Sequence, residues 1–173
     1  MRHLTLTALF LLAALSMLAL AASKPEPEQS TQVVFVVRHA DTSPGEDRDP
    51  DLNERGIERA KQLASLLANE PLDAIFVTNT ERSRQTAAPI ALAFTLAPTQ
   101  YPATDAESLR EMIMQLPANT TALVVAHSNT VTMINEALGA PSVGDIPHDE
   151  FSHLYAIVLS NGEHVRTITL RIE

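Results

Sequence analysis

Short apolar runs alternate with longer amphipathic stretches along most of this chain. The clearest run is 33–37, which is rich in β-branched residues and bounded by polar ones, a pattern typical of a buried, parallel strand, here predicted over 32–37. The run 122–126 (ALVVA) has the same character, 74–78 predicts a further strand, and 99–101 a short one. The chain therefore contains at least four segments suited to the interior of a sheet.

Helices are predicted between these strands from capping residues and from apolar positions repeated at helical spacing. They run from Asn53 to about residue 69, from Asn79 or Thr80 to about 94, from Thr104 or Asp105 to about 116, and from 130 to 138, where Gly139 ends the last one. Each helix follows one of the strands, so strands and helices alternate.

The C-terminal part differs, because two strand-like runs, 154–159 and 164–172, flank Asn161-Gly162. This dipeptide is the strongest short signal for a hairpin turn. Together with the alternation before it, this pattern predicts an α/β fold: a three-layer αβα sandwich with a mainly parallel sheet and a C-terminal antiparallel hairpin at its edge.

The first 31 residues have a different organisation. A short basic start, an uncharged apolar run over 4–20 and the small-x-small sequence Ala19-Leu20-Ala21 predict a signal peptide over 1–21, with an uncleaved membrane anchor as the alternative. Residues 22–31 are polar with alternating Pro and Glu and predict a linker, which leaves 32–173 as the folded domain. We expect secretion, into a bacterial periplasm, with no stable membrane insertion after cleavage.

Composition narrows the chemistry further. The absence of Cys excludes disulfides, thiolate metal sites and a Cys nucleophile. The net charge of −9 disfavours nucleic acids and anionic membranes as partners. A cationic pocket would be a local exception to this acidic field.

Cationic and imidazole groups stand at the ends of three predicted strands. The first strand ends in Arg38 and His39, the second leads to Arg82 in the first helical turn, and the third ends in His127. The carboxyl ends of parallel strands lie at one edge of a sheet, where such folds bind ligands. Four groups can thus surround one anion. An imidazole can attack phosphorus and a guanidinium can bind phosphate oxygens, so a phosphate pocket is predicted.

Four ordered blocks of sequence resemble the histidine phosphatase (phosphoglycerate mutase-like) superfamily, and most resemble its small bacterial members without a large cap insertion. The blocks are VVRHADT (36–42), NERG (53–56), TERSRQTA (80–87) and VVAHSNT (124–130). The resemblance implies that His39 is the nucleophile that becomes phosphohistidine, that Arg38 and Arg82 hold phosphoryl oxygens, and that His127 stabilises charge on the transferring group. It implies a small phosphorylated substrate and neither metal nor other cofactor.

This chemistry has two further requirements, a neutral His39 and a general acid. His39 must attack as neutral imidazole, so one ring nitrogen should be held as N–H by an acceptor such as a carbonyl. The general acid has no clear sequence signal: Asp105 is the first candidate, with Glu107 or Asp41 as alternatives, and a substrate with a good leaving group would need none.

Three functions remain open at this point. A phosphatase acting on a small phosphomonoester is the leading hypothesis. A non-catalytic phosphate- or ligand-binding module on the same fold is the alternative, and phosphoglycerate mutase-type transfer is disfavoured because the predicted signal peptide directs the chain away from the cytoplasm.

Overall fold

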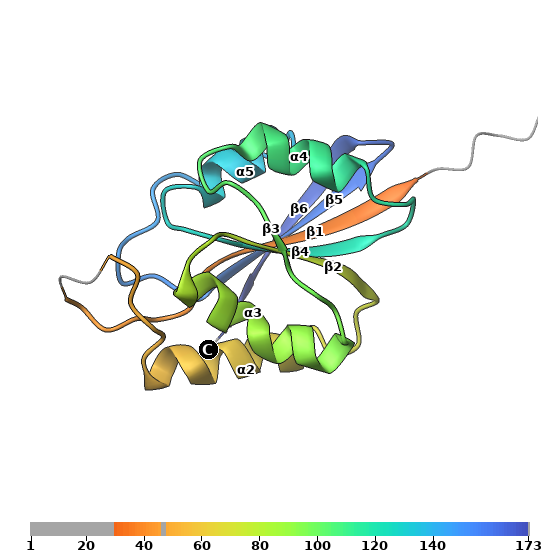
Figure 1. Ribbon diagram of the computed structural model, residues 1–173. Coiled ribbons are helices and arrows are strands. Elements are labelled where there is room, and N and C mark those ends of the chain that lie inside the picture. Colours follow the sequence, from red (N-terminus) through yellow and green to blue (C-terminus); the bar gives the residue numbers. More distant parts are fainter. Residues whose placement is uncertain (1–29, 46–47, 173) are drawn as a thin grey trace, which may run out of the picture.

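The centre of the molecule is a mixed sheet with the strand order β3-β2-β4-β1-β5-β6 (Figure 1). The computed structural model describes residues 30–45 and 48–172. The strands are β1 (Thr31–Arg38), β2 (Leu72–Val77), β3 (Thr99–Gln100), β4 (Thr121–Ala126), β5 (His153–Ser160) and β6 (Glu163–Arg171). Strands β1 to β4 pair in parallel, whereas β5 pairs antiparallel with β1, and β6 with β5.

Helices cover both faces of this sheet. They are α2 (Glu54–Leu66), α3 (Glu81–Phe94), α4 (Ala106–Met114) and α5 (Val131–Ala137). The pair α2 and α3 lies on one face and the pair α4 and α5 on the other (Figure 1). This arrangement confirms the predicted three-layer sandwich with its antiparallel hairpin at the edge.

The apolar run of β1 is continuous because the strand is buried on both faces. Val34 and Val36 belong to the core that includes residues of α4 and α5, while Phe35 and Val37 belong to the core that includes residues of α2 and α3. Successive side chains of a strand point to opposite faces, so a strand between two helical layers needs apolar residues at every position. This burial fixes the strand that leads to Arg38 and His39.

The capping residues act as the sequence predicts. Asn53 Oδ1 accepts a hydrogen bond from the Gly56 amide, and α3 and α4 start after Thr80 and Asp105 rather than after the alternatives Asn79 and Thr104. At the hairpin, Asn161 and Gly162 have φ angles of 51° and 79°. Both angles lie in the left-handed region that this turn requires, so the dipeptide determines where the chain reverses.

The predicted signal peptide, 1–21, lies outside the described residues, and so does most of the predicted linker, 22–31. Strand β1 begins at Thr31, one residue before the predicted start of the domain. Within the described part of the chain, no helix is both long and apolar enough to cross a membrane.

The loop that follows β1 is tied to α2 through Asp41. Arg59 Nε donates to Asp41 Oδ2 at 2.6 Å, and Arg59 Nη1 donates to the carbonyl of Ile172 at 2.5 Å. The Asp41 backbone carbonyl accepts from the Asn53 amide, and a Cβ on Gly56 would lie 2.1 Å from that carbonyl oxygen. Both Asp41 and Arg59 are buried, so this contact sets how closely α2 approaches the start of the loop.

The close approach at Gly56 predicts that Gly56→Ala destabilises the protein. In a helix, alanine is more favourable than glycine by about 1 kcal/mol. Here, however, the added Cβ would clash with backbone, which no side-chain rotation can relieve, and such overpacking costs about 1–3 kcal/mol or more. We expect a net loss of about 2 kcal/mol in the free energy of unfolding, measured by urea denaturation. Gly45→Ala is the control, because a Cβ at Gly45 meets no atom within 4 Å. Equal stability of the two variants would contradict the prediction.

Candidate active site

The parallel pairing of β1 with β4 brings the two predicted pocket histidines together. In the register of these strands Arg38 is opposite Ala126, and the His39 amide donates to the Ala126 carbonyl at 2.9 Å. His127 follows the last residue of β4 directly. The ring centroids of His39 and His127 are 5.3 Å apart, and the ring planes are inclined at 60°. Two strand ends thus deliver two imidazoles to one place.

All four predicted pocket residues, Arg38, His39, Arg82 and His127, line one pocket of about 440 Å³. Arg48 and His148 line it too, and the other described lining residues are Thr42, Ser43, Pro44, Gly45, Pro50, Ser128 and Asn129. None of the described lining residues is a carboxylate. The pocket is therefore a cationic site in a protein of net charge −9.

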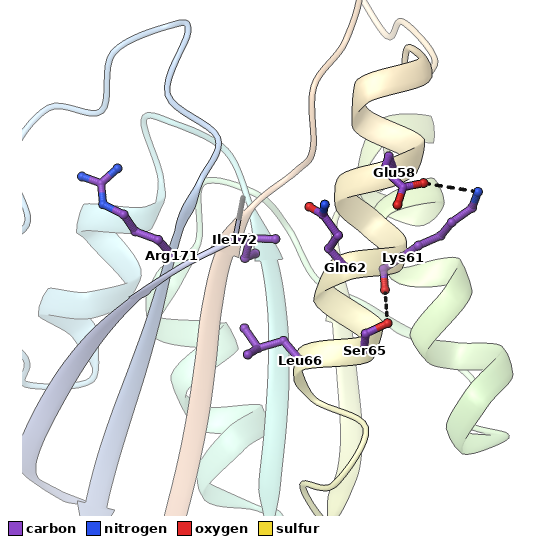
Figure 2. A pocket seen from close by; sticks show the side chains of 7 residues that line it. All are labelled: Glu58, Lys61, Gln62, Ser65, Leu66, Arg171 and Ile172. Carbon is purple, nitrogen blue, oxygen red and sulfur yellow. Dashed lines mark hydrogen bonds and ion pairs between the residues drawn. The ribbon is translucent and has the colours of Figure 1, made fainter.

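A second hollow of similar size lies between α2 and the C-terminal end of β6 (Figure 2). Its charged lining residues include Glu58 and Lys61, which form an ion pair at 3.6 Å. Neither a histidine nor any predicted site residue lines it. The chemistry therefore points to the pocket at the strand ends.

His39 is held in the form that attack on phosphorus requires. Its Nδ1 is 2.9 Å from the Ala40 carbonyl, so Nδ1 carries the proton and donates, and Nε2 keeps its lone pair. Burial, the nearby His127 and the two arginines lower the pKa of His39 to about 3. The ring is therefore neutral at physiological pH, with the expected carbonyl as its partner.

His127 is oriented by a chain of hydroxyl groups. Its Nε2 lies 2.9 Å from Thr78 Oγ1, and the Thr78 hydroxyl donates to Ser83 Oγ at 2.8 Å. The oxygen of Thr78 can thus accept from an Nε2–H of His127. Burial, followed by the charges of Arg82 and Arg38, lowers the pKa of His127 to about 4. Both pocket histidines are neutral for the same physical reasons.

Arg38 joins the pocket to a loop far along the chain. Its Nη1 donates to the carbonyls of Pro147 and Glu150 at 2.9 and 2.8 Å, and its guanidinium lies 3.8 Å from the ring centroid of Phe151. Its Nε is buried and has no hydrogen-bond partner within the described residues. Burial lowers the pKa of Arg38 from its ordinary value. Arg38 thus brings a buried guanidinium, a group that binds oxyanions, to the lining of the pocket.

Arg82 is positioned by the first turn of α3. Thr86 Oγ1 accepts from the Ala40 amide at 2.9 Å and donates to the Arg82 carbonyl at 2.7 Å, which fixes this turn beside His39. Arg82 Nη1 donates to Asp49 Oδ1 at 3.1 Å, and the Glu81 amide donates to the same carboxylate. An acidic side chain thus sits where Arg82 and the helix amides favour an anion.

None of the three candidate acids is among the described residues that line the pocket. Asp105 caps α4, accepting from the Ser108 amide and hydroxyl at 3.0 and 2.7 Å, and these bonds lower its pKa. Asp105 and Glu107 line a different hollow, beside α5. Asp41 is committed to Arg59 and to Arg55. Each of these carboxylates has a structural partner or lies elsewhere, so none has geometric support as the acid.

Arg48 and His148 are pocket residues that sequence reasoning missed. Both stand in irregular segments, and neither belongs to a strand end or to any of the four sequence blocks. No spacing signal could have found them. Within the described residues, no group of three or more His, Asp or Glu side chains could hold a metal ion.

Part of the chain matches a known family model, and its fold matches known structures. Residues 34–115 match the model of the histidine phosphatase superfamily (branch 1). No curated protein matches the chain. Among solved structures, the protein histidine phosphatase SixA complexed with tungstate has a TM-score of 0.67 at 18% identity, covering 80% of this chain and 96% of that one.

Two further structures share the fold. The mycobacterial glucosyl-3-phosphoglycerate phosphatase has a TM-score of 0.63 at 13% identity, covering 80% of this chain and 97% of its own. The phosphoglycerate mutase of Plasmodium falciparum has a TM-score of 0.54 at 18% identity, covering 83% and 90%. At these identities the likeness concerns the fold.

The lowered pKa values predict that acid destabilises the protein through its pocket. Below pH 6.5 the unfolded state takes up protons on His39 and His127, whereas the folded state does so only near pH 3 to 4. The free energy of unfolding therefore falls as the pH drops from about 6 to 4.5, by about 1 kcal/mol per pH unit for each histidine. Urea denaturation across this range should show a shallower loss for His39→Ala and for His127→Ala. Slopes parallel to that of the wild type in both variants would contradict the prediction.

Proposed function

We propose that this chain, which belongs to the histidine phosphatase superfamily, hydrolyses a small phosphomonoester through a phosphohistidine intermediate on His39. The observation that carries the proposal is the state of His39: a neutral ring, with Nδ1–H fixed on the Ala40 carbonyl and Nε2 unprotonated, in a pocket lined by arginines. This combination suits a nucleophile toward phosphorus.

In the proposed reaction His39 Nε2 forms a bond to phosphorus while the bond to the leaving oxygen breaks. Arg38 and Arg82 offer donors to the phosphoryl oxygens, whose charge they balance through the transition state. Water then breaks the N–P bond and releases inorganic phosphate. The hydrogen bond from Nδ1 to Ala40 supports the positive charge that develops on the ring during the first step.

His127 contributes as a neutral group in this scheme. Its imidazole stands beside His39, and Thr78 limits its rotation. A neutral second imidazole does not repel the arginines, because it carries no positive charge.

A non-catalytic phosphate-binding module is the second candidate. It is favoured by one observation: the carboxylates expected as acids lie outside the pocket, and none of the described lining residues is a carboxylate. Such a module would keep Arg38, His39, Arg82 and His127 as anion ligands without turnover. The predicted signal peptide over 1–21 supports the further proposal that either protein works in the bacterial periplasm.

Turnover and a trapped intermediate decide between these functions. The protein should hydrolyse 4-nitrophenyl phosphate without loss of rate in the presence of a chelator, and acid-quenched enzyme should carry acid-labile, base-stable phosphate on His39. His39→Ala should lower kcat by at least about a thousandfold, because it removes the nucleophile. His164→Ala, a histidine on β6 outside the pocket, is the matched control.

The opposite results are equally informative. Phosphate binding with neither turnover nor a phosphoenzyme, over a broad panel of phosphate esters, would establish the binding module instead. Transfer of phosphate between the hydroxyls of a glycerate without net release would indicate a mutase.

A further inference from the structure

We propose that His148 is the general acid that protonates the leaving oxygen, an inference that rests on the proposed function. The sequence predicted a carboxylate, Asp105, Glu107 or Asp41, for this role. His148 instead lies in the loop between α5 and β5. It nevertheless lines the pocket together with His39, Arg38 and Arg82. The reaction on an alkyl ester needs such a group, because an alkoxide is a poor leaving group.

Among the residues of the pocket that the structure describes, the others leave this role to His148. His127 is committed through Nε2 to Thr78, and the arginines do not give up protons near neutral pH. The remaining described lining residues are hydroxyl, amide, proline and glycine residues. Imidazole is the side-chain group that most readily gives and takes a proton near neutral pH. His148 is exposed, and its ring makes no hydrogen bond or ion pair with another residue in the described part of the chain.

His148 stands on a turn that the pocket itself holds in place. The Glu150 amide donates to the Pro147 carbonyl at 3.0 Å, which closes a turn with His148 and Asp149 at its tip. Arg38 Nη1 donates to the carbonyls of Pro147 and Glu150, the two residues that bracket the tip. A predicted phosphate ligand therefore fixes the position of the loop that carries the acid.

Phe151, the residue after this turn, is a second connection between the turn and the pocket. Phe151 lies over the Arg38 guanidinium at 3.8 Å and has its ring centroid 5.9 Å from that of His39. The turn is thus held from the pocket side both by hydrogen bonds and by an aromatic contact. Its tip stays at the mouth of the pocket, where the part of the substrate beyond the phosphate must lie.

The proton balance of the proposed reaction closes with this residue. His39 Nε2 bonds to phosphorus, the P–O bond to the leaving group breaks, and protonated His148 gives its proton to that oxygen, releasing the alcohol. Neutral His148 then takes a proton from the water whose oxygen attacks the phosphohistidine. The N–P bond breaks with its electron pair returning to His39 Nε2, inorganic phosphate leaves, and His148 is protonated again.

Asp149, at the same turn, is the competing donor. Its charge acts on Arg38, where it opposes the lowering of the guanidinium pKa, so the carboxylate lies within electrostatic reach of the site. It does not line the pocket, whereas His148 does. The two residues can be separated by experiment because they are independent side chains of one exposed turn.

The test is the dependence of kcat/KM on the leaving group, in wild-type protein, His148→Ala, Asp149→Asn and the control His164→Ala. The series runs from 4-nitrophenyl phosphate through phenyl phosphate to glycerol 2-phosphate. Removing a general acid costs about a hundredfold to a thousandfold where the leaving oxygen needs the proton, and far less where it does not. We expect His148→Ala to lose that factor on glycerol 2-phosphate and less than about tenfold on 4-nitrophenyl phosphate.

The outcomes separate the acid from other roles. A steeper leaving-group dependence in His148→Ala alone supports the inference. A loss by the same factor across the series, no loss, or a steeper dependence in Asp149→Asn alone overturns it while the phosphatase stands. A wild-type protein that hydrolyses no member of the series and forms no phosphohistidine overturns the proposed function and this inference together.

Discussion

The parallel pairing of β1 with β4 is the constraint on which the site depends. Both strands are buried on both faces, so their register is fixed by two cores at once. With Arg38 opposite Ala126, the residues that follow each strand, His39 and His127, emerge side by side. A slip by one residue would move every apolar side chain of β1 to the other face. The geometry of the two imidazoles is therefore as stable as the sheet.

Arg38 extends this constraint from the sheet to the loops. A buried guanidinium is costly to desolvate, and here the cost is offset by two carbonyl acceptors and an aromatic face. The two carbonyls belong to Pro147 and Glu150, in the loop before β5, so Arg38 also determines where this loop lies. Asp41, two residues past His39, does the same for α2 through Arg59. The short segment 38–41 thus connects both sides of the pocket to the core.

The parts of this molecule that could be predicted are those governed by local chemistry or by burial on both faces. The strands, the caps at Asn53 and Asp105, and the turn at Asn161-Gly162 are examples, and the grouping of the four pocket residues follows from the strand ends. The positions of loop side chains could not be predicted. The bond from Arg38 to Pro147 joins residues 109 positions apart, and no periodic pattern encodes it. For the same reason Asp105 looked suitable as an acid, whereas the contact that occupies it is its own helix cap.

The same charges that would bind phosphate also keep the pocket histidines neutral. Burial lowers the pKa of both rings most, and Arg38 and Arg82 lower it further, so Nε2 of His39 is unprotonated. Asp49 meanwhile accepts from Arg82 and from the first amide of α3. A phosphoryl group that binds Arg82 through the same Nη1 competes with this carboxylate for one donor. Under the proposed function, phosphate binding would therefore exchange one anion for another on Arg82, and a dianion has the advantage over a single carboxylate because it brings more negative charge to Arg38 and Arg82, which both line the pocket.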